Sequence, residues 1–391
     1  MISVQEAKDL ILQNIQLLET ETVCLSSAYG MILAQAVVSK IDVPAFDNSA
    51  MDGYAVKYDD QIHSFRVTQY IQAGELTNME LNSGEAAQIF TGAPIPKNAD
   101  TVIPRELISV SDGNINFSPN IISRGMHIRK RASQNATDEI IAQAGAFMNP
   151  GLIALLSSCG VQSVVVYKRP SVSFIVTGNE LIEPGNPLPE GSVYNSNGPA
   201  IYSFLQLCGI QSIHAFSAPD QKNTLREKIE QALDCSDVVI LTGGVSAGDF
   251  DFVPQVLAEL GVQKLFHKVK QKPGKPIYCG KKNNQWIFGL PGNPAAVLAC
   301  LNQYVKPCLF GISGHHEIFR QFVVLAIAHT WTKKPGLSHI LKVKMEGQKV
   351  KILDGQESFN LLPFNECNGF MVMDEDTEVL EKGARVNVYP I

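Results

Sequence analysis

The sequence predicts a multidomain protein of the α/β and β class, and three regions of the chain carry that prediction. Between residues 171 and 312, apolar runs of strand length alternate with segments of helical periodicity, which is typical of an α/β domain with a mostly parallel sheet. Residues 64–110 alternate apolar and polar positions between Gly and Pro breaks, which indicates a β-rich domain. After His315, short strand patterns recur to residue 391 and predict a small sheet or barrel.

The first helix and the segment after it can be placed from periodicity. Apolar residues at helical spacing predict an amphipathic helix over residues 3–18: Val4, Ala7, Leu10, Ile11 and Leu18. The stretch PAFDNSAMDGYAV (44–56) is polar and contains glycine, so no regular element is expected there. The apolar segment GLIALLSSCG (151–160) predicts a second helix before the α/β domain begins.

The elements of the α/β domain follow from alternating patterns. Strands are expected at SVSFIVTG (171–178), IQSIHAF (210–216) and DVVILTGG (237–244). Helices are expected at 197–208, 222–234, 252–260 and from Pro294 onward. Ligands of parallel sheets bind at the carboxyl ends of the strands, so we expect the polar segments TGNEL (177–181) and TGGVSAGDFD (242–251) to lie at one edge.

Size and composition limit the possible functions. At 391 residues the chain exceeds what one hydrophobic core usually serves, so several domains are expected. Its 45% hydrophobic and 18% charged residues are typical of a globular protein. A formal net charge of −6 without a basic stripe argues against nucleic acid as a partner.

Three features predict a cytoplasmic protein. No apolar run approaches the roughly eighteen residues that a membrane-spanning helix needs, so no membrane association is expected. Charged residues interrupt the first apolar repeat, which argues against a signal peptide. The eight cysteines contain no C-x-x-C pair and mostly lie in apolar contexts, so we expect reduced core residues and no zinc site.

The segment CSDVVILTGGVSAGDFD (235–251) is the most informative part of the chain. Gly243 and Gly244 follow an apolar strand and would let backbone N–H groups approach an anion, while Asp249 and Asp251 offer oxygen ligands to a cation. Downstream, HKVKQKPGKP places four lysines around a Pro-Gly turn, and FGLPGNP follows: Lys268, Lys270, Lys272 and Lys275. Together these features predict a site for a phosphorylated ligand and a metal ion.

Each candidate also has a simpler structural interpretation. The motifs around Asp52 and Thr91 are typical of capped turns. Glu180 is typical of a solvent-facing helix start. Asp220 fits the N-cap of helix 222–234 as well as it fits a ligand-facing position, and Asp249 could also cap a helix.

The order of these motifs along the chain resembles that of the molybdopterin molybdenumtransferase family, which includes the gephyrin E domain. The motifs are FDNSAMDGYA, IFTGAP, TGNEL, TGGVSAGDFD, KPGKP and FGLPGNP, and the likeness is collinear to residue 391. The resemblance implies an elongated homodimer with four regions in each chain. They are a linking domain (1–44 and 136–170), an inserted β-rich domain (45–135), an α/β molybdopterin-binding domain (171–312) and a C-terminal β-barrel domain (313–391).

The resemblance also implies an activity. Family members use Mg²⁺ to insert molybdate into adenylylated molybdopterin and release AMP, which is a step of molybdenum cofactor biosynthesis. A molybdopterin adenylyltransferase would act upstream. Apo-molybdoenzymes or their chaperones would receive the product.

The family's functional positions carry over to named residues of this chain. The catalytic set is Asp52, Asp251, Lys268 and Lys272. The substrate-binding set is Thr91, Glu180, Asp220, Gly243, Gly244, Ser246, Lys275, Pro291 and Pro294. Asp251 and Glu180 are expected to hold Mg²⁺, and Lys272 and Lys275 to neutralise the molybdate dianion. Asp52 is expected to reach the α/β cleft from the partner subunit.

Several positions depart from the family pattern. Gln134 stands for an acidic residue, Asn179 for an aspartate, Ala296 for a serine and Phe359 for a glycine. These losses favour an alternative, a divergent paralogue that binds molybdopterin or a partner protein without efficient turnover. Under the first hypothesis, Gln134→Asp should raise magnesium affinity or turnover. A third hypothesis, a molybdopterin adenylyltransferase, leaves residues 44–110 and the C-terminal strands unexplained.

Overall fold

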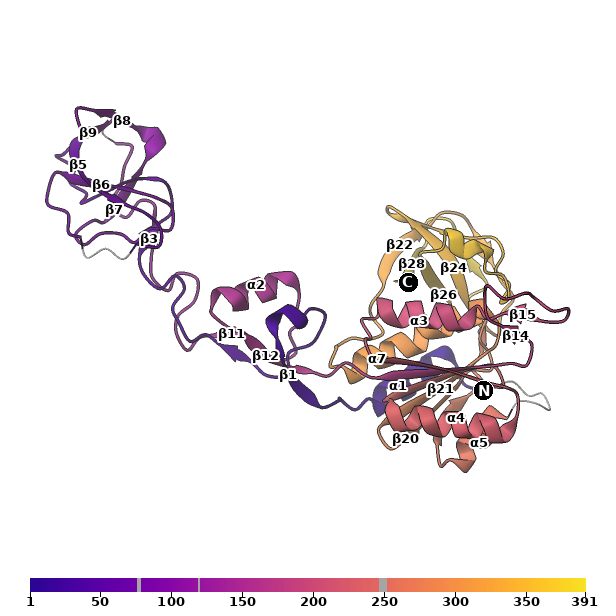
Figure 1. The fold of residues 1–391 in the computed structure, drawn as a ribbon. Helices are drawn as coiled ribbons and strands as arrows, with labels where there is room; N and C mark the ends of the chain where they lie inside the picture. Colours follow the sequence, from indigo (N-terminus) through magenta and orange to yellow (C-terminus); the bar gives the residue numbers. More distant parts are fainter. Residues whose placement is uncertain (76–78, 119, 246–251) are drawn as a thin grey trace. The chain divides into compact units, whose positions relative to one another are not determined.

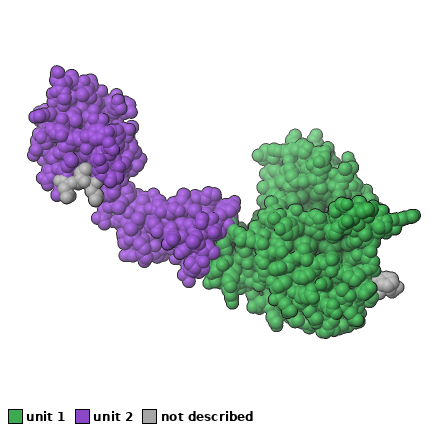
Figure 2. Space-filling view, in the orientation of Figure 1, with its two compact units in different colours: residues 1–21, 30–34, 166–391 green, residues 22–29, 35–165 purple. Residues whose placement is uncertain are grey.

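The computed structural model describes residues 1–75, 79–118, 120–245 and 252–391 and divides them into two compact units (Figure 2). Unit 1 consists of Met1–Glu21, Gly30–Ala34 and Val166–Ile391, and unit 2 of Thr22–Tyr29 and Gln35–Val165. The expected α/β and barrel regions therefore belong to unit 1, and the expected β-rich region belongs to unit 2. The four-region division of the chain stays a prediction.

Unit 1 contains a six-stranded sheet in the order β16-β13-β17-β21-β20-β18. The strands are β13 (Val172–Thr177), β16 (Ile213–Ala218), β17 (Val238–Thr242), β18 (Gln263–His267), β20 (Tyr278–Lys282) and β21 (Gln285–Leu290). The first four in the sheet order run parallel, whereas β20 and β18 are antiparallel to their neighbours. The expectation of a mostly parallel sheet is confirmed.

Helices cover both faces of this sheet (Figure 1). They are α1 (Val4–Asn14), α3 (Asn197–Leu207) and α6 (Pro294–Cys300) on one face, and α4 (Lys222–Cys235) and α5 (Val253–Glu259) on the other. Successive strand side chains point to opposite faces, so Phe174 packs in the core with α1 and Ile175 in the core with α4. The sheet is thus buried on both sides, as its continuous apolar strands require.

Helix α1 is shorter than its periodicity suggests. A capping box begins it, because the Glu6 backbone N–H donates to Ser3 Oγ at 3.1 Å and the Ser3 N–H donates to Glu6 Oε2 at 2.7 Å. It ends at Asn14, whose carbonyl accepts a hydrogen bond from Lys281 Nζ at 2.9 Å. Leu18 packs on the same core from the extended segment that follows, which explains why the apolar pattern continues past the helix.

The helix that begins at Pro294 runs without a break to Ile312. It consists of α6, a π-helical turn (Leu301–Val305) and α7 (Lys306–Ile312). The most apolar 18 residues of this 19-residue helix have a mean hydropathy of 1.3, so by length and composition the helix could cross a membrane, and the expectation that no such run exists is wrong. It is 83% buried within the protein, which is typical of a core helix.

The C-terminal region forms a closed barrel of five strands. They are β22 (Val323–Ile327), β24 (Ser338–Glu346), β25 (Lys349–Ile352), β26 (Gly369–Met373) and β28 (Arg385–Pro390). The order β24-β25-β22-β28-β26 closes because β26 also pairs with β24. The short strand β19 (Gln271–Lys272) pairs in parallel with the first residues of β24, which joins the barrel to the KPGKP segment.

Unit 2 contains a second six-stranded sheet in the order β7-β4-β6-β5-β9-β8, so the expected β-rich region is confirmed. Its strands are β4 (Gly53–Val56), β5 (Ser64–Ile71), β6 (Glu85–Ile89), β7 (Thr101–Pro104), β8 (Ile108–Ser111) and β9 (Asn114–Phe117). The prediction that 44–56 contains no regular element is wrong, because β4 lies there, buried between β6 and β7. Glycine is required at its first position, since a Cβ on Gly53 would lie 2.1 Å from the Ile103 carbonyl oxygen.

The remaining elements are short. The expected second helix is α2 (Pro150–Ser158), which Asn149 caps by accepting from the Leu152 N–H at 2.9 Å. The other strands are β1 (Thr20–Cys24), β2 (Val37–Val38), β3 (Asn48–Ser49), β10 (Ile128–Arg129), β11 (Ile140–Ala142), β12 (Ser163–Tyr167), β14 (Leu181–Ile182), β15 (Val193–Tyr194), β23 (Trp331–Thr332) and β27 (Val379–Leu380). Single 3₁₀ turns occur at Leu25–Ser27, Arg105–Leu107 and Leu362–Asn365.

Candidate functional site

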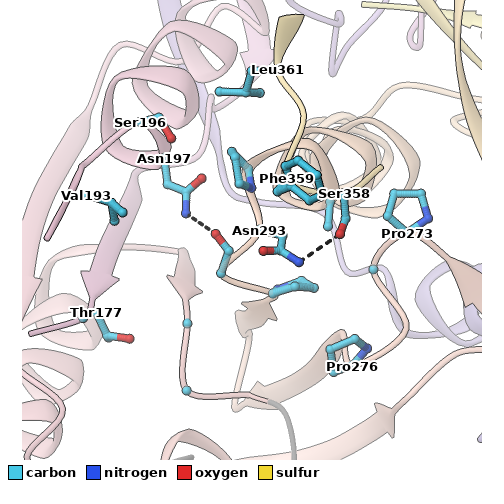
Figure 3. Close-up of a pocket in the computed structure, with 18 of the residues that line it drawn as sticks. Thr177, Val193, Ser196, Asn197, Pro273, Pro276, Asn293, Ser358, Phe359 and Leu361 are labelled. Carbon is cyan, nitrogen blue, oxygen red and sulfur yellow. Dashed lines mark hydrogen bonds between the residues drawn. The ribbon is translucent and has the colours of Figure 1, made fainter. Parts of the chain in front are cut away.

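A cleft of about 930 Å³ lies in unit 1 at the carboxyl edge of the parallel strands (Figure 3). Its walls come from the ends of β13, β17 and β21, from the turn after β19, and from a barrel segment at residues 356–361. The cleft brings together eight of the predicted site residues: Glu180, Asp220, Gly243, Gly244, Lys272, Lys275, Pro291 and Pro294. The sequence expectation that TGNEL and the glycine pair share one edge is confirmed.

The glycine pair allows the chain to turn close to the neighbouring strand. Gly243 has a φ of +90°, and a Cβ there would lie 2.5 Å from Thr177 Oγ1. Its own N–H donates to the Leu290 carbonyl at 3.1 Å, so this amide is not available to an anion. The contribution of Gly243 is therefore its conformation, which corrects the expectation that both glycine amides face the ligand.

The two lysines lie on a turn whose backbone is held in place by contacts with buried side chains. The buried side chain of Gln271 accepts a hydrogen bond from the Tyr304 hydroxyl and donates to the Gly274 carbonyl at 3.3 Å. Gly274 packs so closely that a Cβ would lie 2.5 Å from Cys300 Sγ. Lys272 and Lys275 flank this turn and are exposed, and no ion pair to either is found among the residues that the structure describes. Their charges are thus available to an anionic ligand.

The LPGNP segment connects the α/β domain with the barrel. Asn293 Nδ2 donates to Ser358 Oγ at 2.9 Å, and the Ala295 N–H donates to the Ser358 carbonyl at 3.0 Å (Figure 3). Pro294 occupies the first turn of α6, as expected. Because Ser358 takes the Ala295 N–H, and the next two N–H groups of α6 donate to Asn293, this helix end offers few amides to an anion.

Asn197, at the start of α3, holds the same segment from the other side. Its Nδ2 donates to the Gly292 carbonyl at 2.8 Å. Its Oδ1 is buried without a hydrogen-bond partner among the described residues.

The two acidic residues of the cleft lie on neighbouring loops. Glu180 lies in the turn between β13 and β14, so its interpretation as a helix start is wrong. The N-cap of α4 is Gln221, so the interpretation of Asp220 as that cap is wrong as well. The Asp220 N–H donates to Asn179 Oδ1 at 3.1 Å, which ties the two loops together. An aspartate at position 179 could accept the same bond, so this departure leaves the local structure intact.

Other predicted residues are not part of this cleft as described. Lys268 follows β18 with a φ of +68° and does not line the cleft. Ser246, Asp249 and Asp251 lie outside the described residues. Within the described ranges, no group of three His, Cys, Asp or Glu side chains is placed to hold a metal ion.

Asp52 and Thr91 meet in unit 2. The backbone N–H and the hydroxyl of Thr91 both donate to Asp52 Oδ1, each at 2.8 Å. These bonds, the backbone one above all, lower the pKa of Asp52, so the carboxylate is ionised at neutral pH. The two motifs were recognised separately in the sequence, and their contact could not be inferred from it.

Gln134 also lies in unit 2 and has structural partners. Its Nε2 donates to Asn135 Oδ1 at 3.2 Å and to Ser158 Oγ at 3.3 Å. Its relation to a magnesium site stays a prediction. A carboxylate at this position would lose both donated bonds.

Sequence reasoning missed the barrel's share of the cleft. The sequence identifies Phe359 only as a departure from the family pattern and does not single out Ser358, although both line the cleft. Lys342 was not noted at all. It is buried in β24, and its ammonium holds the segment that carries Ser358. The strand pattern HILKVKM contains two lysines, Lys342 and Lys344, and nothing in the pattern shows which of them is buried.

Models of three protein regions match the chain in order. They are the MoeA N-terminal region (domain I and II) at residues 2–160, a probable molybdopterin binding domain at 173–311 and the MoeA C-terminal region (domain IV) at 325–391.

Curated relatives and solved structures cover nearly the whole chain. A molybdopterin molybdenumtransferase of Haemophilus influenzae is 32% identical over 401 residues, covering 100% of this chain and 98% of that protein. One of Staphylococcus aureus is 32% identical over 351 residues, covering 88% and 83%. The crystal structure of a molybdopterin biosynthesis moeA protein from Pyrococcus horikoshii OT3 superposes with a TM-score of 0.85 at 26% identity, covering 100% of both chains.

Proposed function

The chain belongs to the MoeA family of molybdopterin molybdenumtransferases and has a role in molybdenum cofactor biosynthesis, and from this premise we propose that it inserts molybdate into adenylylated molybdopterin and releases AMP. One observation carries the proposal. Lys272 and Lys275 share a cleft with Glu180 and Asp220, at the carboxyl ends of parallel strands.

The charges of the cleft suit these substrates. Molybdate is a tetrahedral dianion, and the dithiolene and phosphoanhydride of the other substrate add negative charge. Lys272 and Lys275 would neutralise this charge and hold molybdate near the dithiolene. Because the turn between the lysines is packed against buried Gln271, the backbone that carries the two lysines is fixed before the substrate arrives.

We assign a magnesium ion to the acidic side of the cleft. Glu180 and Asp220 supply two carboxylates there, which is the ligand type that Mg²⁺ prefers, and Asp251 is the further ligand that the family pattern suggests. When bound, the ion would polarise the phosphoryl group that is cleaved. Asn179 supports this side of the cleft by holding the Asp220 backbone.

A second candidate is a protein that binds molybdopterin without efficient turnover. Two departures from the family pattern, Ala296 and Phe359, lie in the cleft itself. Ala296 replaces a hydroxyl next to the LPGNP turn. The loss of a polar group that stabilises a transition state would lower turnover more than binding.

The deciding experiment measures AMP. Purified protein is incubated with adenylylated molybdopterin, molybdate and Mg²⁺, and AMP release is followed with molybdate or Mg²⁺ omitted as controls. We expect AMP to appear only when both are present. Tight binding of the pterin without AMP release would favour the binding protein, and release independent of molybdate would contradict the proposal.

We also propose that the protein is a cytoplasmic homodimer that receives its substrate from a molybdopterin adenylyltransferase. Apo-molybdoenzymes or their chaperones would take the product. In this arrangement Asp52 of the partner subunit completes the cleft.

A further inference from the structure

Phe359 presents an unusually large apolar surface in the cleft. It is 69% exposed, although phenylalanine side chains are usually packed away from water. The aromatic pairs found among the described residues do not include it. Its ring is therefore available to another flat group.

The backbone that carries Phe359 is fixed in place by a buried lysine. Lys342 is 3% exposed, and its ammonium donates to the carbonyls of Gly355 at 2.5 Å, Glu357 at 3.1 Å and Asn360 at 2.9 Å. These carbonyls lie on both sides of Phe359 in the chain. The side chain of Gln356 adds a bond to the Leu353 carbonyl at 2.7 Å.

The residue before Phe359 is fixed from the α/β domain. Ser358 accepts from Asn293 Nδ2 through its hydroxyl and from the Ala295 N–H through its carbonyl. The exposed ring thus stands on a segment bound by side chains of the barrel and by the first turn of α6. A ring on so well anchored a backbone loses little further freedom when it packs against a ligand.

The cleft is lined by both charged and apolar side chains. Lys272 and Lys275 supply positive charge, Glu180 and Asp220 supply carboxylates, and Leu337, Phe359 and Leu361 supply apolar surface. A ligand that uses both the lysines and Phe359 carries anionic groups and a flat ring.

We infer that Phe359 is a specificity-determining residue that stacks on a heteroaromatic ring of the substrate. This inference rests on the proposed function, because adenylylated molybdopterin contains two such rings, the pterin and the adenine. The family pattern has a glycine here, so the stacking contact would be a property of this chain and not of the family at large.

The test measures binding of separate probes to the full-length protein by calorimetry. AMP carries the adenine ring, pterin-6-carboxylate carries the pterin ring, and inorganic molybdate carries neither. The variants are Phe359→Ala, which removes the ring, and Phe359→Tyr, which keeps it. Leu362→Ala is the matched control, because Leu362 is 81% exposed three residues away and does not line the cleft.

We expect Phe359→Ala to weaken one ring probe about 5- to 150-fold, the range for loss of an aromatic stacking partner, and to leave molybdate binding unchanged. Phe359→Tyr should bind like the unaltered protein, as should Leu362→Ala. A loss for AMP alone assigns the contact to the adenine, and a loss for the pterin alone assigns it to the pterin. Equal losses for all probes, or no loss for either ring, would overturn the inference.

The outcome can be separated from that of the proposed function. Molybdate-dependent AMP release together with unchanged ring binding in Phe359→Ala would reject the stacking contact alone. Ring binding that depends on Phe359 in a protein without AMP release would support the contact and reject the transferase.

Discussion

At the scale of single residues, the contacts that each residue makes decide which of its groups remain available to a ligand in the cleft. Lys272 and Lys275 are exposed on a rigid turn and form no ion pair among the described residues, so their charge is available to a ligand. Gly243 is the opposite case, because its amide is already paired and only its conformation matters.

The lysines should distinguish the two substrates. If they hold molybdate, Lys272→Ala and Lys275→Ala should each weaken molybdate use about 10- to 100-fold, the range for a lost charge-assisted contact, and affect binding of the adenylylated pterin less. The measurement is AMP release across a molybdate titration, beside calorimetric binding of the pterin. Lys264→Ala, which removes an exposed lysine outside the cleft, should change neither value. Equal losses for both substrates would mean that the lysines serve the phosphates.

At the scale of elements, two buried lysines join the barrel to its surroundings. Lys342 of β24 holds the segment 355–360, and Lys8 of α1 lies near the barrel strand β28. Burial lowers the pKa of both ammonium groups, that of Lys8 to about 8.

Lys342→Met should destabilise the protein and disturb the cleft. The change leaves three backbone carbonyls without their donor, which costs on the order of 1–3 kcal/mol of the free energy of unfolding. Denaturant unfolding measures this cost, and binding of the ring probe that depends on Phe359, AMP or pterin-6-carboxylate, should weaken at the same time because Phe359 loses its support. Lys344→Met is the matched control, because Lys344 lies on the same strand but pairs with Glu346 and Glu366 at the surface. If both variants were equally stable, the three hydrogen bonds that Lys342 donates would make no net contribution to the free energy of unfolding.

Lys8 should make stability depend on pH. Its ammonium is buried, donates to Gln303 Oε1 at 3.2 Å and lies 4.9 Å from the centre of the Tyr389 ring. Burial lowers its pKa, and the charge of Asp374 opposes this shift in part. The folded state therefore binds fewer protons than the unfolded state between pH 8 and 10.5, and the contribution of Lys8 to stability rises with pH in that window.

The comparison with Lys8→Met isolates this effect. As the pH rises from 8 to 10, the free energy of unfolding of the unaltered protein should increase relative to that of Lys8→Met by about 1 kcal/mol per pH unit. Tryptophan fluorescence in denaturant measures it. Lys382→Met, which removes an exposed lysine of the barrel region, should give a smaller slope. A difference that is flat with pH would show that Lys8 titrates as it does in the unfolded chain.

At the scale of the whole molecule, the predicted site residues are divided between the two units. Asp52 and Thr91 belong to unit 2, and the cleft residues belong to unit 1. The proposed homodimer would supply Asp52 of the partner subunit to each cleft.

Mixing two impaired variants, at a molybdate concentration too low to support turnover by Lys272→Ala, tests this arrangement. Asp52→Ala and Lys272→Ala are unfolded together, refolded as a mixture and assayed for AMP release. A mixed dimer has one intact site, so random pairing should restore about a quarter of full activity. Sedimentation should show a dimer at micromolar concentration. No recovery in a proven mixed dimer would mean that Asp52 acts within its own chain, and a stable monomer would remove the shared site altogether.

Local sequence patterns were enough to predict the α/β domain and eight of the residues that line the cleft. Apolar periodicity is a local property, so the strands at 171–178 and 237–244 and the helix from Pro294 were found with small shifts of their ends. The TGNEL segment and the glycine pair could be expected together because the carboxyl ends of parallel strands share an edge. The KPGKP lysines lie between the antiparallel strands β18 and β20, and their charge and the family resemblance assigned them to the site.

The contribution of the barrel to the cleft could not be predicted from local patterns, because it depends on contacts between distant parts of the chain. The bond between Asn293 and Ser358 joins residues 65 positions apart, and the contact between Asp52 and Thr91 spans 39 positions. The pairing of the Gly243 amide and the burial of Lys342 likewise depend on partners that local pattern does not specify. A residue's neighbours along the chain set its periodicity, but its partners in space set which of its groups stay free to bind a ligand.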